Sequence, residues 1–189
     1  MEIFENGNLR IILDGCEKKD RKSQKMLYEQ FFGYALSICM RYTPNEYYAM
    51  EVLNDAFMKV FTQLKKFDHT RSFKSWFRKI LINTSIDHLK KEVKHQHHQK
   101  IEGLEIENHR HTVDHQIQHE ELIGLIQQLT PAYRSVFNLY VIDGYQHDEI
   151  ARMLRISIGT SKSNLAKARK RLREMLSKID KNEIVRFIR

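Results

Sequence analysis

The sequence predicts an all-α protein made of two small helical domains joined by a polar linker. Three observations support this class. Apolar residues recur at intervals of three and four along most of the chain, seven Gly and two Pro among 189 residues leave few positions for tight hairpin turns, and one central stretch has few large apolar residues. With 41% hydrophobic residues, the chain can bury cores without disulfide bonds.

The first predicted domain spans residues 5–91 and begins with two helices. Leu9, Ile12 and Leu13 form a short apolar stripe that ends near Gly15. Apolar residues at helical spacing then continue through residues 27–42, and Pro44 is expected to end that helix because proline lacks the backbone N–H.

The second half of this domain is predicted to hold two longer helices. Apolar residues over 50–67 follow one face of a helix of about six turns. A polar break at 68–71 follows, and Ser72 is expected to cap the next helix. That helix carries Phe73, Trp76, Phe77 and further apolar residues to Leu89.

Residues 92–120 form the predicted linker, which contains seven of the ten His residues. So polar a segment is expected to be extended or only partly helical. The second domain spans 121–189 and restarts with apolar residues over 122–129. Thr130 is expected to be the N-cap of the following helix, with Pro131 at its first position.

A helix-turn-helix pattern follows within the second domain. Residues 148–154 form a short helix in which the small Ala151 permits close approach of a neighbour, residues 155–158 supply a turn, and Gly159 opens the next helix. In that helix Leu165, Ala168 and Leu172 are expected to point inward.

The positive charge is concentrated in two segments. The formal net charge is +8, and residues 151–175 alone contain eight Lys or Arg against Glu174, which gives +7. Residues 71–91 carry a further +5. An outer helix so rich in cations repels itself unless a polyanion meets it, so DNA binding is favoured over a merely solvated basic face.

The cluster at 71–91 also contains aromatic residues, for which two interpretations stand side by side. Aromatic rings beside cations are typical of surfaces that stack unpaired bases. Phe73, Trp76, Phe77 and Ile80 have helical spacing, however, which favours a place in the core.

Several short motifs, in this order and spacing, resemble the sigma factors of bacterial RNA polymerase, specifically the small extracytoplasmic-function (ECF) group. In the first domain they are Ala49-Met50-Glu51, Asp55-Ala56-Phe57, Phe73-Lys74-Ser75-Trp76-Phe77, Asn83 and Ile86-Asp87-His88-Leu89-Lys90. In the second they are Leu129-Thr130-Pro131, Asp148-Glu149-Ile150-Ala151, Ile156-Ser157-Ile158-Gly159-Thr160 and Lys162-Ser163.

The resemblance implies a division of labour between the domains. The helix after Met50 would dock on the clamp helices of the polymerase through Glu51, Asp55, Phe57 and Lys59. The −10 element would be melted and held by Asp68, His69, Arg71, Ser72, Lys74, Arg78, Lys79, Asn83 and Thr84. The duplex −35 element would be contacted by Thr160, Lys162, Ser163, Asn164, Ala166, Lys167, Arg169, Lys170, Arg171 and Arg173.

The same resemblance implies RNA polymerase core, including its flap, promoter DNA and a membrane-anchored anti-sigma factor as partners, with no cofactor. A cytoplasmic location is expected, because the chain has only two cysteines and its N-terminus does not read as a charged segment followed by an apolar run and a cleavage site. No stretch approaches the roughly 20 apolar residues that span a bilayer. The cysteines Cys16 and Cys39 are too few for a zinc site.

Two rival functions compete with the sigma-factor interpretation. A dimeric helix-turn-helix regulator would bind palindromic duplex DNA without polymerase. A metal hydrolase would need several ligands that converge from rigid elements, which a His-rich linker does not offer, so no catalytic or metal-binding residue is predicted.

Two positions depart from the family's pattern. Ser161 stands where an apolar residue is usual, so the packing at the start of the recognition helix is expected to loosen. Gln146 stands where Ser or Thr often caps a helix, so the capping box with Glu149 is expected to be missing.

Overall fold

The computed structural model describes residues 2–96 and 116–177, and within these ranges it contains helices and no strand. This confirms the all-α prediction. The chain forms two compact units that divide between His88 and Leu89, and each unit is described by itself.

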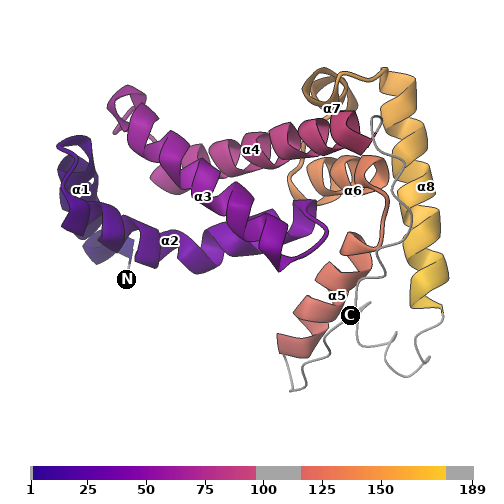
Figure 1. Ribbon diagram of the computed structural model, residues 1–189, viewed down its shortest axis with the longest axis horizontal. Helices are drawn as coiled ribbons and strands as arrows, with labels where there is room; N and C mark the ends of the chain where they lie inside the picture. Colours follow the sequence, from indigo (N-terminus) through magenta and orange to yellow (C-terminus); the bar gives the residue numbers. More distant parts are fainter. Residues whose placement is uncertain (1, 97–115, 178–189) are drawn as a thin grey trace. The chain divides into compact units, whose positions relative to one another are not determined.

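The first unit contains four helices (Figure 1). They are α1 (Glu2–Glu17), α2 (Arg21–Tyr42), α3 (Glu46–Gln63), which ends in a 3₁₀ turn, η1 (Leu64–Lys66), and α4 (Phe73–Gln96), which extends past the boundary between the units. The predicted helix end before Pro44 is confirmed, because α2 ends at Tyr42.

Short polar side chains begin these helices. The Asp20 carboxylate accepts hydrogen bonds from the backbone N and the Oγ of Ser23, at 2.8 and 2.6 Å. Asn45 accepts from Tyr48 N at 3.2 Å. Ser72 Oγ accepts from Ser75 N at 3.3 Å, which confirms its prediction as an N-cap.

Aromatic rings hold α2, α3 and α4 together. Phe77 of α4 contacts Phe57 of α3 and Phe31 of α2, with ring centroids 4.9 and 6.0 Å apart. Phe73 and Phe77 are buried, and Trp76 is half-buried against Phe67. The interpretation of Phe73 and Phe77 as core residues, and not as base-stacking platforms, is therefore confirmed.

Both cysteines are free thiols in this core. Burial raises the pKa of Cys16 to about 11 and that of Cys39 to about 12. Because the thiolate is the reactive form, these side chains act as small apolar groups.

The second unit contains α5 (Gln116–Gln127), α6 (Pro131–Phe137), which continues as the π-helical segment η2 (Asn138–Ile142), α7 (His147–Leu154) and α8 (Ile158–Leu176). Its core joins α5 to α8 through Leu125, Leu129, Ala168 and Leu172. Tyr133 and Phe137 of α6 pack against this cluster.

The turn between α5 and α6 is closed by Arg134, whose role was not predicted from the sequence. Its buried guanidinium donates to the backbone oxygens of Gln127 and Leu129, at 2.7 and 3.0 Å. Thr130 occupies the predicted N-cap position of α6, although its side chain makes no capping hydrogen bond. Pro131 takes the predicted first position.

The helix-turn-helix of the second unit is formed by α7 and α8. Arg155 ends α7 in the left-handed region, with φ 56°. Ser157 caps α8 by accepting from Thr160 N at 2.9 Å, so the helix begins before the predicted Gly159. Gln146 N donates to Glu149 Oε2 at 2.8 Å, which is the half of a capping box that runs from the N-cap backbone to the Glu side chain. The prediction that the capping box is missing is therefore wrong for this half.

We predict that Arg134→Met lowers the free energy of unfolding of the chain by about 2 kcal/mol, because two carbonyl oxygens, one of them in a buried contact, lose a charged donor. Urea unfolding followed by circular dichroism measures this. Arg171→Met, at an exposed position of α8, is the matched control and should change stability little. Equal effects of the two substitutions would contradict the structural role of Arg134.

Candidate nucleic-acid and polymerase-binding surfaces

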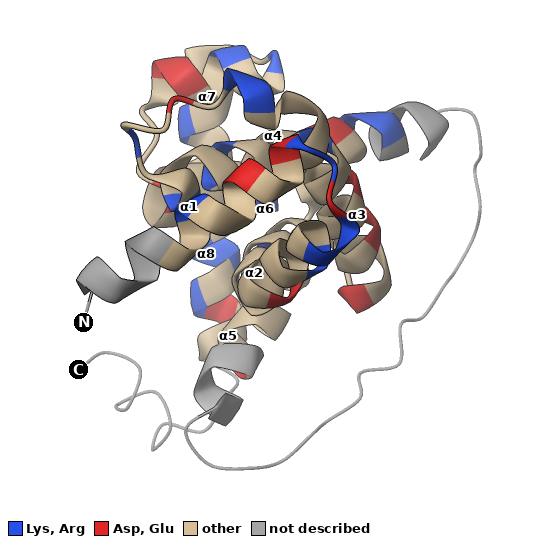
Figure 2. Cartoon of the chain, turned by 90° about the vertical axis from the view of Figure 1, so that its left-hand side faces the viewer, with Lys and Arg blue, Asp and Glu red and all other residues tan. Residues whose placement is uncertain are grey.

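Helix α8 separates a packing side from an exposed cationic side. Ser161, Leu165, Ala168 and Leu172 are buried. Of the residues predicted to contact the −35 element, Asn164 is half-buried and the others are exposed: Thr160, Lys162, Ser163, Ala166, Lys167, Arg169, Lys170, Arg171 and Arg173. The Lys and Arg positions are coloured blue in Figure 2. One helix therefore presents the whole predicted −35 set.

The exposed side of α8 carries a line of small residues that ends in a lysine. Gly159, Ser163, Ala166 and Lys170 follow one another at spacings of four, three and four, which places them on one line opposite the buried residues. The first three of these residues are small. A helix with such a line can bring its backbone close to the floor of a major groove, while the neighbouring lysines reach outward.

The Lys and Arg side chains of α8 differ in their contacts with other side chains of the protein. Arg169 lies over the ring of Tyr140, 5.9 Å from its centroid, and Arg171 pairs with Glu174 at 3.4 Å. Among the described residues, Lys162, Lys167 and Lys170 have no ion-pair partner within the chain. These three lysines are available to phosphates.

Ser161 corrects an expectation drawn from the sequence. Its side chain is fully buried, and its Oγ lies 2.9 Å from Nδ1 of His147. The His147 ring in turn stacks on Tyr140, with centroids 4.5 Å apart. A hydrogen bond and a ring stack thus tie the start of α8 to α7 and η2, so the expected loosening at Ser161 is wrong.

The loop of residues 67–72 before α4 has a fixed internal geometry. Asp68 accepts from the N and Oγ1 of Thr70, at 3.0 and 2.7 Å, and pairs with Arg71 Nε at 3.2 Å. The hydrogen bonds from Thr70, with the charge of Arg71, lower the pKa of Asp68. His69 Nε2 lies 3.1 Å from Glu17 Oε1, which joins the loop to α1.

The predicted −10 residues of α4 are split between surface and core. Lys79 and Asn83 are exposed and one turn apart, and Arg78 is half-buried. Lys74 is exposed and lies over the ring of Tyr34 at 4.7 Å. Thr84 is a correction: its side chain is buried, with 1% exposed, so it cannot reach a DNA strand from this position.

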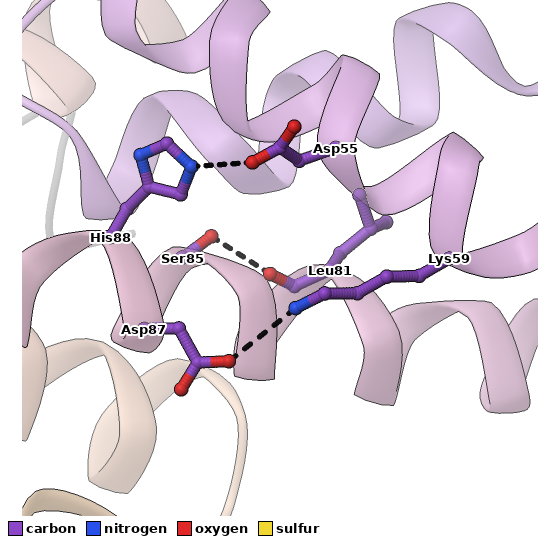
Figure 3. A network of polar contacts seen from close by, with 6 residues as sticks. All are labelled: Asp55, Lys59, Leu81, Ser85, Asp87 and His88. Atoms are coloured by element: carbon purple, nitrogen blue, oxygen red, sulfur yellow. Dashed lines mark hydrogen bonds and ion pairs between the residues drawn. The ribbon is translucent and has the colours of Figure 1, made fainter.

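Two polar pairs clamp α3 to α4, as Figure 3 shows from close by. Asp55 Oδ2 lies 2.9 Å from His88 Nε2, and Lys59 Nζ lies 3.4 Å from Asp87 Oδ2. Asp55 and Lys59, two of the residues predicted to contact polymerase, therefore contact α4. We call the two pairs, Asp55–His88 and Lys59–Asp87, the α3–α4 clamp.

Phe57 is a further correction to the predicted polymerase contact. It is buried, with 2% exposed, and its ring packs on Tyr28 and Phe77. A side chain so enclosed is part of the core and cannot dock on another protein. The reason is helical phase, since Phe57 lies on the inner side of α3.

The outer side of α3 exposes three residues that the prediction from the sequence missed, Tyr47, Asn54 and Met58, beside the predicted Glu51. Tyr47 and Met58 are 76% and 62% exposed, and Glu51 and Asn54 lie between them at spacings of four, three and four. We call these four residues the outer α3 face. The signal was present in the sequence as two large apolar residues out of phase with the buried stripe.

No group of three or more His, Cys, Asp or Glu side chains that could hold a metal ion occurs in the described ranges. The His-rich tract lies outside the residues whose side chains are described. Within 2–96 and 116–177, no helix is long and apolar enough to cross a membrane.

Comparisons with known proteins match both units. The family model described as "Sigma-70 region 2" matches residues 27–95, and "Sigma-70, region 4" matches residues 119–172, so the two ranges together span more than half of the chain. The ECF RNA polymerase sigma factor SigM of Bacillus subtilis is 23% identical over 154 residues, which cover 80% of this chain and 94% of SigM. The ECF RNA polymerase sigma-E factor of Escherichia coli K12 is 23% identical over 172 residues, covering 85% of this chain and 90% of the relative.

A solved structure supports the fold. The sigma factor RpoE of Bartonella quintana, in complex with the anti-sigma factor NepR, superimposes with a TM-score of 0.51 at 23% sequence identity. The match covers 83% of this chain and 98% of that chain.

We predict that the α3–α4 clamp contributes measurably to stability. A double-mutant cycle of Asp55→Ala and His88→Ala should give a coupling energy of about 0.5 to 1 kcal/mol in urea unfolding, because His88 is half-buried while Asp55 stays hydrated. The pair Lys25 and Glu29, which is exposed on α2, is the control and should couple by about 0.3 kcal/mol. A coupling energy at Asp55 and His88 no larger than at the control pair would contradict the clamp.

Proposed function

The chain belongs to the sigma-70 family, in the ECF group of RNA polymerase sigma factors, and we propose that its two units divide the family's work between two promoter elements. As a sigma factor it directs bacterial RNA polymerase core to specific promoters for initiation. The observation that carries the division is that both matched regions occur in order, each with its own exposed cationic surface.

The proposed domains are residues 5–91 for polymerase docking and the −10 element, 92–120 as linker, and 121–189 for the −35 element. Sigma factors initiate transcription without catalysing a reaction of their own, so no catalytic residue is proposed. The work with polymerase on chromosomal DNA places the proposed site of action in the cytoplasm.

The −35 element is the proposed ligand of α8. The small line of Gly159, Ser163 and Ala166 would face the groove floor, with Lys162 and Lys167 on either side. Lys170, Arg171 and Arg173 would neutralise phosphates. Arg169, whose guanidinium lies over the ring of Tyr140, would bind a phosphate at the edge of the groove.

The −10 element is the proposed ligand of the loop 67–72 and the exposed side of α4. Unstacking a base costs a few kcal/mol, which a preformed loop and nearby cations can offset. Asn83 would hydrogen-bond an extruded base, and Lys79, one turn away, would hold its backbone. Thr84 has no place in this proposal, because it is buried.

Polymerase core is the proposed ligand of the outer α3 face. Exposed Tyr47 and Met58 provide apolar area, while Glu51 and Asn54 provide polar contacts between them. Asp55 and Lys59 would support docking indirectly, by fixing α4 against α3. An anti-sigma factor is a further proposed partner, as in the complex of the Bartonella quintana sigma factor.

Run-off transcription with purified core polymerase tests the function. The template carries the region upstream of the protein's own gene, and the full chain should yield a discrete transcript that core alone does not. The absence of any transcript, together with tight binding of the chain alone to a palindromic duplex, would instead support a dimeric regulator.

We predict that Lys162→Ala with Lys167→Ala reduces initiation about tenfold to a hundredfold, since each lost contact costs on the order of 1 kcal/mol or more. Run-off yield at fixed holoenzyme concentration measures this. Arg10→Ala with Lys25→Ala, two exposed cations of the first unit, removes the same charge and should leave the yield within twofold. A template with a scrambled −35 element should lose its sensitivity to the double substitution.

We predict that Asn83→Ala reduces promoter opening more than closed-complex binding, by about tenfold. Permanganate footprinting of unpaired thymines measures opening, and electrophoretic mobility shift at low temperature measures the closed complex. Thr62→Ala, at an exposed position of α3, is the control for general effects of substitution. Normal permanganate reactivity in the Asn83 variant would refute the assignment.

A further inference from the structure

The turn between α1 and α2 carries a cationic cluster that the proposed function does not use. Residues 17–25 contain five basic residues, Lys18, Lys19, Arg21, Lys22 and Lys25, against Glu17 and Asp20. All five are exposed. The turn is therefore a third concentration of positive charge, separate from α4 and α8.

The two acids of this segment are already engaged elsewhere. Asp20 caps α2 by accepting from Ser23, and those hydrogen bonds lower its pKa, so it remains a carboxylate bound to its own helix. Glu17 lies 3.1 Å from His69 of the loop before α4. Neither acid forms an ion pair with a lysine or arginine of the turn in the described residues.

Four of the cations have no ion-pair partner among the described residues, namely Lys18, Lys19, Arg21 and Lys22. Lys25 differs, because it pairs with Glu29 at 3.6 Å. We call the four residues the basic turn. Like charges gathered on one short turn repel one another and are stabilised by a polyanion.

The basic turn has a fixed shape. Lys19 is held in the left-handed region, with φ 62°. Gly15 has no side chain where the side chain of Ser23 lies, and a Cβ at this position would collide with it. Backbone hydrogen bonds from Lys19 N to Cys16 O and from Asp20 N to Gly15 O, both 3.0 Å, close the turn. The cations therefore stand on an ordered backbone.

The basic turn lies beside the loop that is proposed to hold the −10 element. Glu17, the residue next to Lys18, contacts His69 of that loop directly. Helix α1 also packs on η1, which precedes the loop and exposes Lys65 and Lys66. Within the first unit, α1 and the residue before the turn thus contact both η1 and the loop.

We propose that the basic turn binds phosphates of the promoter strand whose bases the loop 67–72 and Asn83 hold. This inference rests on the proposed function, because it extends the −10 surface to α1 and α2. A strand fixed at His69 carries its neighbouring phosphates past Lys18 and Lys19. Such contacts are independent of base identity and strengthen the grip on any opened promoter.

A negatively charged surface of a protein partner is the rival ligand for this cluster. The strand is favoured because Glu17, the residue next to Lys18, directly contacts His69 of the −10 loop. The two ligands predict different losses, of DNA affinity in one case and of core polymerase affinity in the other.

The test uses holoenzyme assembled from the full chain and core polymerase. The probe is a fork-junction DNA with an unpaired −10 strand, taken from the promoter that the run-off assay identifies. Lys18→Gln with Lys19→Gln, and Arg21→Gln with Lys22→Gln, are compared with the unsubstituted chain. Affinity for the probe is measured across a salt series, and affinity for core polymerase is measured in parallel.

Each double variant is expected to bind the fork about tenfold more weakly at low salt, with a slope of log affinity against log salt that is smaller by about 1.4, or about 0.7 per lost phosphate contact. The matched control is Gln30→Glu with Ser37→Glu, which changes the net charge equally on the exposed outer side of α2 and should alter the slope little. Thermal unfolding verifies that all variants fold.

Unchanged fork affinity and slope in both variants, with a normal run-off transcript, would overturn the basic turn and leave the proposed function intact. Loss of core polymerase affinity without loss of fork affinity would overturn it in favour of a protein ligand. An unsubstituted chain that yields no transcript would overturn the proposed function and this inference together.

Discussion

The ring of Phe77 is the contact on which the first unit depends. It lies among rings of α2 and α3, so one side of α4 is committed to the core. Because residues of a helix are spaced at a fixed angle around its axis, burial of this side determines which α4 residues face outward. Lys79 and Asn83 are exposed for the same reason that Phe73 and Thr84 are buried. The surface proposed to meet DNA is thus defined by the aromatic core beneath it.

The α3–α4 clamp adds a second constraint, on the register between α3 and α4. Aromatic packing fixes the distance between helices but tolerates small rotations and slides, whereas a pair such as Asp55 and His88 favours one register. Residues that sit beside the outer α3 face thereby hold the helix that carries Asn83. In the proposed function, two neighbouring helices with a shared set of contacts would therefore serve polymerase docking and binding of the opened strand.

Helical periodicity was enough to predict the fold class and the inner and outer sides of α8, and the proline at position 44 was enough to predict the end of α2. It failed where a single position decides between core and surface. Phe57 was assigned from its place in a family motif and Thr84 from its polarity beside Asn83, but their helical phase puts both inside. Arg134, Ser161 and His147 depend on contacts between elements, which no local pattern encodes. For Ser161, a polar residue in an apolar slot had a partner 14 positions earlier in the chain.

Helix α8 keeps its packing residues and its exposed residues on opposite sides, and this affects which substitutions the protein can accept. Its packing side is anchored by Leu165, Ala168 and Leu172 and by the buried hydrogen bond of Ser161, and none of these faces outward. Its outer line of small residues and lysines makes no contact on which the core depends. If α8 reads the −35 element as proposed, substitutions there would shift the preferred promoter sequence while the fold persists. A duplicated gene could therefore acquire a new regulon by drifting at a few surface positions, without passing through an unstable intermediate.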